Sequence, residues 1–174
     1  MRRRFVPVAL VFLGSAVAPS AAELDELTAR YGDELTNCYD AAADTDARLA
    51  CIGVMSSTCM GTEAGGETTT GMSLCLQAER AGWDVLLNAE YRRTLAWSMS
   101  MDAEDAGSFP EFANRAKTLR DAQRAWMSFR DAECANAYAA WGSGSLRVIG
   151  AANCLMDITA KRAVALRQKR ELMN

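Results

Sequence analysis

Histidine is missing from the 174-residue chain, which removes the side chain that most often acts as general acid or base near neutral pH. No serine lies in a nucleophile-elbow context, and no pair of carboxylates stands out as a glycosidase pair would. The cysteines form no C-x-x-C pair, so their spacing does not resemble a zinc site. We therefore expect a protein that is not an enzyme and that holds no cofactor and no metal.

Strand signals are nearly missing as well, because no alternating run of β-branched residues occurs. Alanine, leucine, methionine, glutamate and arginine dominate, and these residues favour helices. The sequence predicts an all-α antiparallel bundle of about four to five helices with three disulfides. Helices are expected over 24–41, over 46–60 after a Thr45 cap, from 69 or 70 to about 101, from a Ser108 cap to Trp141 with Glu111 three residues on from that cap, and from about 146 onwards.

Two of these segments carry the bulky residues expected in the core. Apolar residues at helical spacing form one stripe that faces a core, and methionine in such a stripe is core filler more often than a copper(I) ligand. The inward-facing candidates are Trp83, Leu87, Tyr91, Leu95 and Met99 in the third helix, and Phe112, Leu119, Trp126, Phe129 and Tyr138 in the fourth.

The first 22 residues have the pattern of a secretory signal peptide. Three arginines precede the apolar run Phe5–Ala18, and small residues then allow cleavage after Ala22. No second long apolar run follows, so no transmembrane anchor is expected. These features predict a periplasmic or secreted protein.

Removal of that leader makes the chain more acidic. The leader holds three of the 19 Lys+Arg and none of the 22 Asp+Glu, which leaves 16 basic against 22 acidic residues and a net charge of −6. A polyanion needs a basic face, so nucleic acid is excluded as a partner. A cationic protein is favoured, because opposite charge steers association.

Six cysteines in an exported chain indicate three disulfides. The sequence alone allows about 15 connectivities, of which nearest-neighbour pairing is the most economical. On the chain-entropy model each such bridge stabilises by roughly 3 kcal/mol. The expected pairs are Cys38–Cys51, Cys59–Cys75 and Cys134–Cys154.

The stretch AQRAWMSFRDAEC, residues 122–134, places polar groups among aromatics. On a helix Gln123, Trp126 and Arg130 share one face, and Asp131 is rotated away from it toward different neighbours. These groups could be an acid and an electrophile, but with no group suited to proton transfer the favoured interpretation is a set of ties that fix helix register.

Four segments resemble the LprI-like lysozyme-inhibitor family of exported proteins: CMGTEAGGETTTGMSLC, LLNAEYRRTL, LRDAQRAWMSFRDAEC and CLMDITAKRAVAL. The resemblance implies an all-helical domain over 59–174 with Cys59–Cys75 and Cys134–Cys154 bridges, which leaves 23–58 as an amino-terminal helical extension with one disulfide. It also implies that the protein binds and inhibits lysozyme. The matching motifs contain Trp83, Leu87, Asn88, Tyr91, Gln123, Trp126, Phe129, Arg130, Asp131, Thr159 and Arg162, which we interpret as scaffold.

The segment WGSGSLR is the candidate binding loop, formed by Trp141, Gly142, Ser143, Gly144, Ser145 and Arg147 with Leu146 between the last two. Glycine and serine make it narrow, Trp141 can anchor it, and Arg147 could meet a carboxylate in a lysozyme cleft. The alternative is an ordinary connection between two helices. A second candidate is the polar loop 61–71, whose Glu63 and Glu67 could touch a basic surface.

The sequence therefore predicts an exported protein that inhibits lysozyme-type muramidases by occluding the active-site cleft. The alternative from another class is a non-catalytic envelope module that binds another protein or peptidoglycan. A carboxylate-based hydrolase acting on wall glycan is a weaker third hypothesis.

Overall fold

The computed structural model describes residues 21–173, and the predicted signal peptide therefore lies outside this range except for Ala21 and Ala22, which open the first helix. The all-α prediction is confirmed, with no strand in the described range. The elements are α1 (Ala21–Ala41), α2 (Thr45–Leu49), α3 (Val54–Thr62), α4 (Thr69–Asp105), a 3-10 turn η1 (Pro110–Phe112), α5 (Arg115–Ala139) and α6 (Arg147–Met173).

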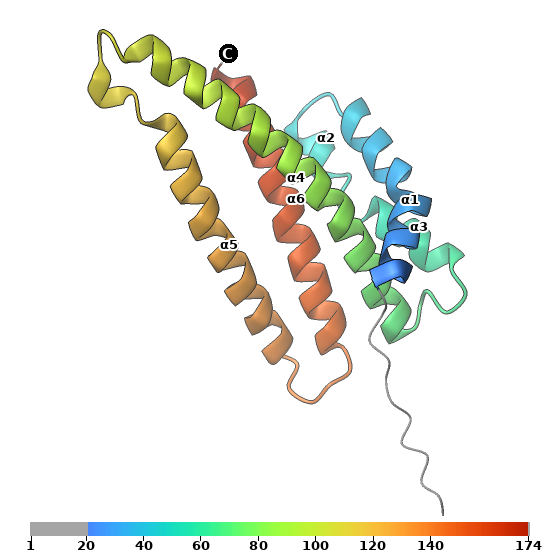
Figure 1. Ribbon diagram of the computed structural model, residues 1–174. Helices are drawn as coiled ribbons and strands as arrows, with labels where there is room; N and C mark the ends of the chain where they lie inside the picture. Colours follow the sequence, from blue (N-terminus) through green and yellow to red (C-terminus); the bar gives the residue numbers. More distant parts are fainter. Residues whose placement is uncertain (1–20, 174) are drawn as a thin grey trace, which may run out of the picture.

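Two long helices, α4 and α6, run parallel side by side and form the centre of the bundle (Figure 1). Helix α5 packs against α6 and, less extensively, against α4, while α1 and α3 cover another side of α4. The short helix α2 contacts α6. The long helices α4, α5 and α6 alternate in direction. The α4–α5 turn and the α5–α6 turn therefore lie at opposite ends of the bundle.

The second helix was predicted as one segment over 46–60, and this prediction is wrong. Gly53 has a φ of 95°, a backbone conformation that glycine adopts without steric cost, and it separates α2 from α3. The cap of α2 is Asp44 rather than Thr45: its carboxylate accepts the amide of Ala47 at 2.8 Å.

The start of α5 also differs from the prediction. Ser108 does not cap a helix; the chain makes the η1 turn first, and α5 begins at Arg115. The cap comes from another helix, because the Asp102 carboxylate on α4 accepts the amides of Arg115 and Ala116, each at 2.9 Å. Burial opposes ionisation of Asp102, but these amides and the Arg115 guanidinium together hold its pKa below the usual value.

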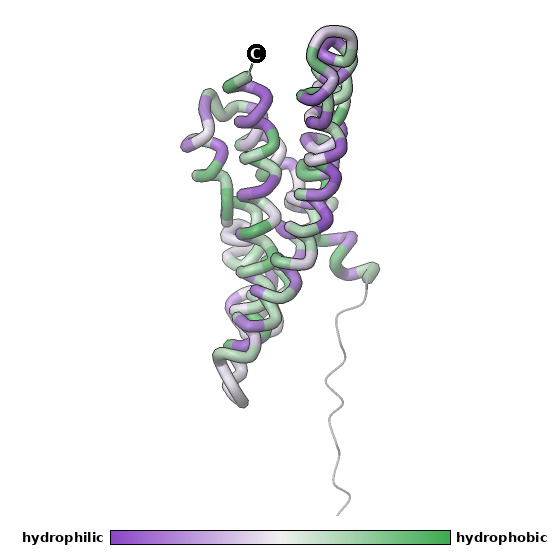
Figure 2. The backbone as a smooth tube through the Cα atoms, turned by 90° about the vertical axis from the view of Figure 1, so that its left-hand side faces the viewer, coloured by the Kyte–Doolittle hydropathy of each residue, from purple (hydrophilic) through white to green (hydrophobic). Residues whose placement is uncertain are grey.

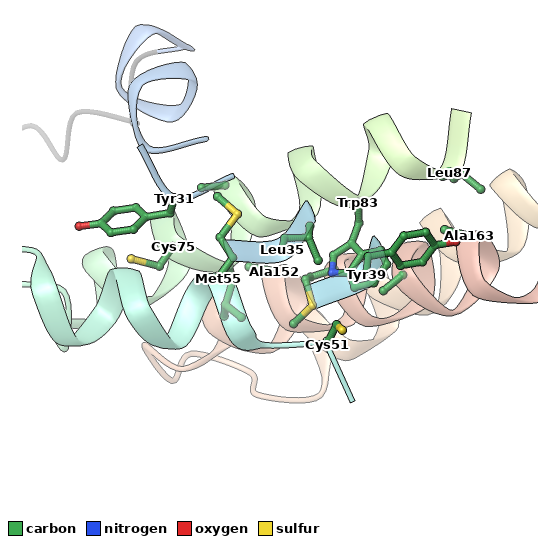
Figure 3. Packing of buried hydrophobic residues seen from close by; sticks show 14 of the residues in the cluster. Tyr31, Leu35, Tyr39, Cys51, Met55, Cys75, Trp83, Leu87, Ala152 and Ala163 are labelled. Carbon is green, nitrogen blue, oxygen red and sulfur yellow. The ribbon is translucent and has the colours of Figure 1, made fainter. Parts of the chain in front are cut away.

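The core lies between α4, α6 and the first three helices (Figure 3). Trp83 is fully buried and meets Tyr39 edge-on with ring centroids 5.7 Å apart. Burial raises the pKa of Tyr39 to about 12. The large side chains of this core come both from residues 23–58 and from residues 59–174. They are Leu27, Tyr31, Leu35, Tyr39, Met55, Leu74, Leu76, Trp83, Leu87, Leu119, Met156, Val164 and Leu166.

Four residues predicted to face inward are exposed instead. Met99 is 52% exposed, Phe112 59%, Phe129 57% and Tyr138 40%. Phe129 and Tyr138 lie on α5, which buries only a narrow stripe with Ala116, Leu119 and Cys134 as its buried residues, so apolar side chains beside that stripe reach solvent. Met99 lies on the exposed side of α4, and Phe112 lies in the η1 turn.

Two carboxylates are buried in the bundle. Glu79 is 0% exposed and accepts the amides of Gly53 and Ser56 at 2.6 and 2.7 Å and the Trp83 indole N–H at 2.9 Å. Glu90 is 1% exposed and pairs with Arg170 of α6. Glu79 thus ties α4 to the start of α3, and Glu90 ties α4 to α6.

All three disulfides pair nearest neighbours, so the predicted connectivity is confirmed. The Cα–Cα distances are 5.8, 5.7 and 5.4 Å for Cys38–Cys51, Cys59–Cys75 and Cys134–Cys154. The first bridge joins α1 to the segment between α2 and α3, the second joins α3 to α4, and the third joins α5 to α6.

Candidate functional site

The connection between α5 and α6 forms one end of the bundle, at the bottom of Figure 1. It is a hairpin of two helices whose connecting residues have near-neutral hydropathy (Figure 2). Gly142 has a φ of 54°, and its amide donates to the Ala139 carbonyl at 3.0 Å, as expected after the end of a helix. The Cys134–Cys154 bridge joins α5 and α6 close to this turn. The hairpin is therefore covalently closed.

Trp141 is fixed and accessible at the same time. Its side chain is 50% exposed, and its indole lies on Gly150 of α6. A Cβ at Gly150 would lie 2.7 Å from the indole Nε1, so a larger residue there would push the ring away. Because Gly150 has no side chain, the indole can lie directly against α6. The other half of the Trp141 side chain stays accessible to a partner.

Arg147 is held inside the hairpin by its own neighbours. Its guanidinium carbon lies 5.3 Å from the centroid of the Tyr138 ring, and Nη1 donates to the Gly142 carbonyl at 3.5 Å. No other charged residue occurs between Glu133 and Asp157. The hairpin thus presents one oriented cation in a segment that carries no other charge.

A shallow apolar groove lies beside the hairpin, between α4, α5 and α6. Tyr138, Val148 and Leu155 line one part of it, and Gln77 and Arg80 of α4 line another. Tyr138, which was predicted to face the core, instead connects this groove to Arg147. The groove extends the apolar part of the candidate surface away from the turn.

The second candidate loop, 61–71, is packed against the rest of the bundle. Glu63 accepts the Tyr31 hydroxyl at 2.7 Å and pairs with Arg30, and both contacts lower its pKa. Gly71 lies so close to Gly65 that a Cβ on Gly71 would be 2.1 Å from the carbonyl oxygen of Gly65. Glu67 is exposed, whereas Glu63 is engaged by α1 and is a poor candidate for contact with a partner.

The polar groups of residues 122–134 connect helices. Two guanidinium groups contact the Trp126 ring, with the Arg130 carbon 5.2 Å and the Arg162 carbon 5.8 Å from its centroid. Arg162 donates to Gln123 at 3.0 Å, and burial lowers the pKa of Arg162. Asp131 does not serve a separate neighbour as predicted, because it accepts from Arg130 at 2.9 Å.

The other motif residues occupy different environments. Trp83 and Leu87 are buried, Tyr91 is partly buried against the core, and Asn88 is exposed. Thr159 is fully buried, and its hydroxyl has no hydrogen-bond partner within residues 21–173. Their role as scaffold stays a prediction.

Glu79 and Glu90 were not singled out in the sequence, although they are the most deeply buried carboxylates of the bundle. One sequence signal could have found Glu79. It lies between apolar residues one helical turn before Trp83, where a carboxylate can accept the indole N–H.

Residues 21–173 contain neither a clustered metal site nor a membrane-spanning helix. No group of three or more Cys, Asp or Glu residues there could hold a metal ion. None of the helices in that range is apolar over enough of its length to cross a membrane.

Together the helices and bridges define a small disulfide-bonded helical module with a closed hairpin at one end. The chain belongs to the family described as lysozyme inhibitor LprI, whose model matches residues 59–166. It is also 29% identical over 100 residues to the uncharacterized protein R02472 of Rhizobium meliloti (strain 1021), which covers 58% of this chain and 72% of that protein. No solved structure matches the chain. The family is one of inhibitors. Membership of this family and the presence of disulfides are together typical of an exported protein.

Proposed function

We propose that this protein is exported to the periplasm or beyond and inhibits lysozyme-type muramidases, without catalysis of its own, by placing the hairpin 141–147 in the active-site cleft. The family supports a lysozyme as the partner. The observation that carries the proposal is the half-exposed Trp141 beside the oriented Arg147, on a hairpin closed by a disulfide. A signal peptide over 1–22 would direct the export.

The geometry suits occlusion of a cleft. Lysozyme cleaves glycan with two carboxyl groups that flank the bond, so its cleft offers negative charge to an arginine. Arg147 would meet one of these carboxylates, and Trp141 would fill a sugar-binding position with an aromatic face. Because the turn is already ordered by the disulfide and by the Trp141–Gly150 contact, binding orders few additional residues.

The two parts of the chain would have different roles in this proposal. Residues 59–174 form the inhibitory domain and contain the hairpin. Residues 23–58 are the extension, and its α1 and the first residues of α3 lie on α4, on the part of the bundle that holds Trp83. This extension would stiffen the long central helix rather than contact lysozyme.

Truncation of Trp141 and Arg147 tests the proposal. Trp141→Ala and Arg147→Ala are each expected to weaken inhibition about tenfold, since both remove a central contact of the interface. The measurement is the clearing of a suspension of bacterial cell walls by hen-type, goose-type and invertebrate-type lysozymes, with oxidised protein and at low and moderate salt.

Leu172→Ala is the matched control, because Leu172 is 78% exposed near the other end of α6. This variant should inhibit as the wild type does. Wild-type protein that inhibits none of the three lysozymes at micromolar concentration would contradict the proposal, and so would full inhibition by both hairpin variants.

A further inference from the structure

An exposed aromatic pair lies at the opposite end of the bundle, in the connection between α4 and α5 at the top of Figure 1. Phe109 is 55% exposed and Phe112 59%, with ring centroids 6.4 Å apart. Large aromatic side chains exposed next to each other are uncommon on a protein that has no partner there.

The backbone that carries the two rings is ordered. The Phe109 amide donates to the Asp105 carbonyl at 2.7 Å, and the Phe112 amide donates to the Phe109 carbonyl at 3.0 Å. Asp102 accepts the first amides of α5, which fixes that helix relative to α4. The rings are therefore presented by a defined turn.

The charge around the rings is of one sign. Residues 102–114 contain four carboxylates and no lysine or arginine. Asp102 and Asp105 share a single cation, because both pair with Arg115, at 3.4 and 2.7 Å. Glu104 and Glu111 are exposed and take part in no ion pair within the part of the chain that the structure describes. Two uncompensated carboxylates thus flank two exposed aromatic rings.

The next basic residues along the chain after Arg115 are Lys117 and Arg120, on the first turns of α5. Lys117 is paired with Asp121 at 2.8 Å, and Arg120 lies against the Met99 sulfur at 3.9 Å. They leave the turn itself acidic.

From this arrangement we infer that Glu104, Phe109, Glu111 and Phe112 form a second interaction surface, here named the α4–α5 turn surface, and that it binds a cationic protein segment with apolar side chains. The carboxylates supply charge complementarity, and the rings supply apolar contact and cation–π attraction to lysine or arginine. A second copy of this chain is disfavoured, because it would bring like charges face to face. An anionic membrane surface is disfavoured for the same reason.

This surface goes beyond the proposed inhibitory hairpin. The two surfaces lie at opposite ends of α5, whose 25 residues span about 37 Å at roughly 1.5 Å per residue. A protein seated on the hairpin would leave the α4–α5 turn surface open. The protein could then hold a cationic partner at one end while the other end is occupied.

The binding test uses two labelled amphipathic peptides, one of lysine and leucine and one of glutamate and leucine, with fluorescence anisotropy as the readout. The wild type should bind the lysine peptide and not the glutamate peptide. Phe109→Ser/Phe112→Ser should weaken binding about tenfold, and Glu104→Gln/Glu111→Gln about fivefold with a smaller salt dependence.

Matched controls separate this surface from general stickiness and from the hairpin. Leu172→Ser/Met173→Ser removes another exposed apolar pair, and Asp25→Asn/Asp33→Asn removes two exposed carboxylates of α1. Both variants should bind the lysine peptide as the wild type does, and so should Trp141→Ala, whatever its effect on lysozyme inhibition.

Three outcomes would overturn the inference. The first is unchanged binding of the lysine peptide by either turn-surface variant. The second is equal binding of both peptides by the wild type. The third is self-association of the wild type, seen in sedimentation, that Phe109→Ser/Phe112→Ser abolishes. If Phe109→Ser/Phe112→Ser unfolds, Glu104→Gln/Glu111→Gln still tests the inference, because it changes only exposed groups.

Discussion

Replacement of Glu79 by alanine is expected to lower the free energy of unfolding by about 3–5 kcal/mol, because it leaves buried donors without an acceptor. The carboxylate is 0% exposed and accepts two backbone amides and an indole N–H. No other hydrogen bond to the indole of Trp83 is present in residues 21–173. Urea unfolding, followed by the helical circular dichroism of the oxidised protein, gives the change.

Two further variants make the Glu79 prediction specific. Glu79→Gln keeps one acceptor oxygen and is expected to fall between alanine and the wild type. Glu104→Ala, on the exposed side of the same helix, should change the stability by less than about 0.5 kcal/mol. A Glu79→Ala protein as stable as Glu104→Ala would show that the α3 amides and Trp83 do not depend on this carboxylate.

Removal of the Cys134–Cys154 bridge is expected to weaken lysozyme inhibition about tenfold, which corresponds to roughly 1.4 kcal/mol of binding free energy. The bridge closes the hairpin, and without it the turn must be ordered at the moment of binding. On the chain-entropy model Cys134→Ala/Cys154→Ala also loses roughly 3 kcal/mol of stability. Inhibition is therefore compared at a temperature where circular dichroism shows both proteins to be folded.

The Cys38–Cys51 bridge provides the matched control for this loss. It closes a loop between α1 and the α2–α3 segment and does not touch the hairpin. Cys38→Ala/Cys51→Ala should lose stability of a similar size and keep full inhibition. Equal loss of inhibition in both double variants would mean that global stability, and not the closed hairpin, controls binding.

Local features of the sequence predicted much of the fold. Helix composition and the turn residues between helices located α1, α4, α5 and α6 approximately, and short spacings made nearest-neighbour disulfides the economical choice. Long-range contacts account for the errors. Ser108 and Glu111 match the pattern of a capping box, but Asp102 reaches the α5 amides from another helix.

The errors in the core have a similar cause. Periodicity shows that a helix has an apolar face, but the neighbouring helices decide how wide a stripe they cover. Helix α5 meets its neighbours along a narrow stripe, so Phe129 and Tyr138 reach solvent, and Phe112 is exposed because it lies in the η1 turn before α5. Two of them now line features of interest, Tyr138 the groove beside the hairpin and Phe112 the α4–α5 turn surface.

For the candidate site, the sequence located the hairpin but not its geometry. The glycine–serine run and the flanking cysteines predicted a closed turn at 141–147. The contact between Trp141 and Gly150 arises only when α6 packs back along α5, and the stacking of Arg147 on Tyr138 has the same origin. The binding role of these residues stays a prediction.

Competition with a glycan tests most directly whether the hairpin occupies the lysozyme cleft. Calorimetric titration of this protein into hen-type lysozyme is repeated with the cleft filled by a saturating N-acetylglucosamine oligomer. If the hairpin and the glycan share the cleft, the apparent affinity falls in proportion to glycan occupancy, and Trp141→Ala binds weakly in both titrations. Undiminished binding to glycan-filled lysozyme would contradict occlusion and place the contact elsewhere on the enzyme.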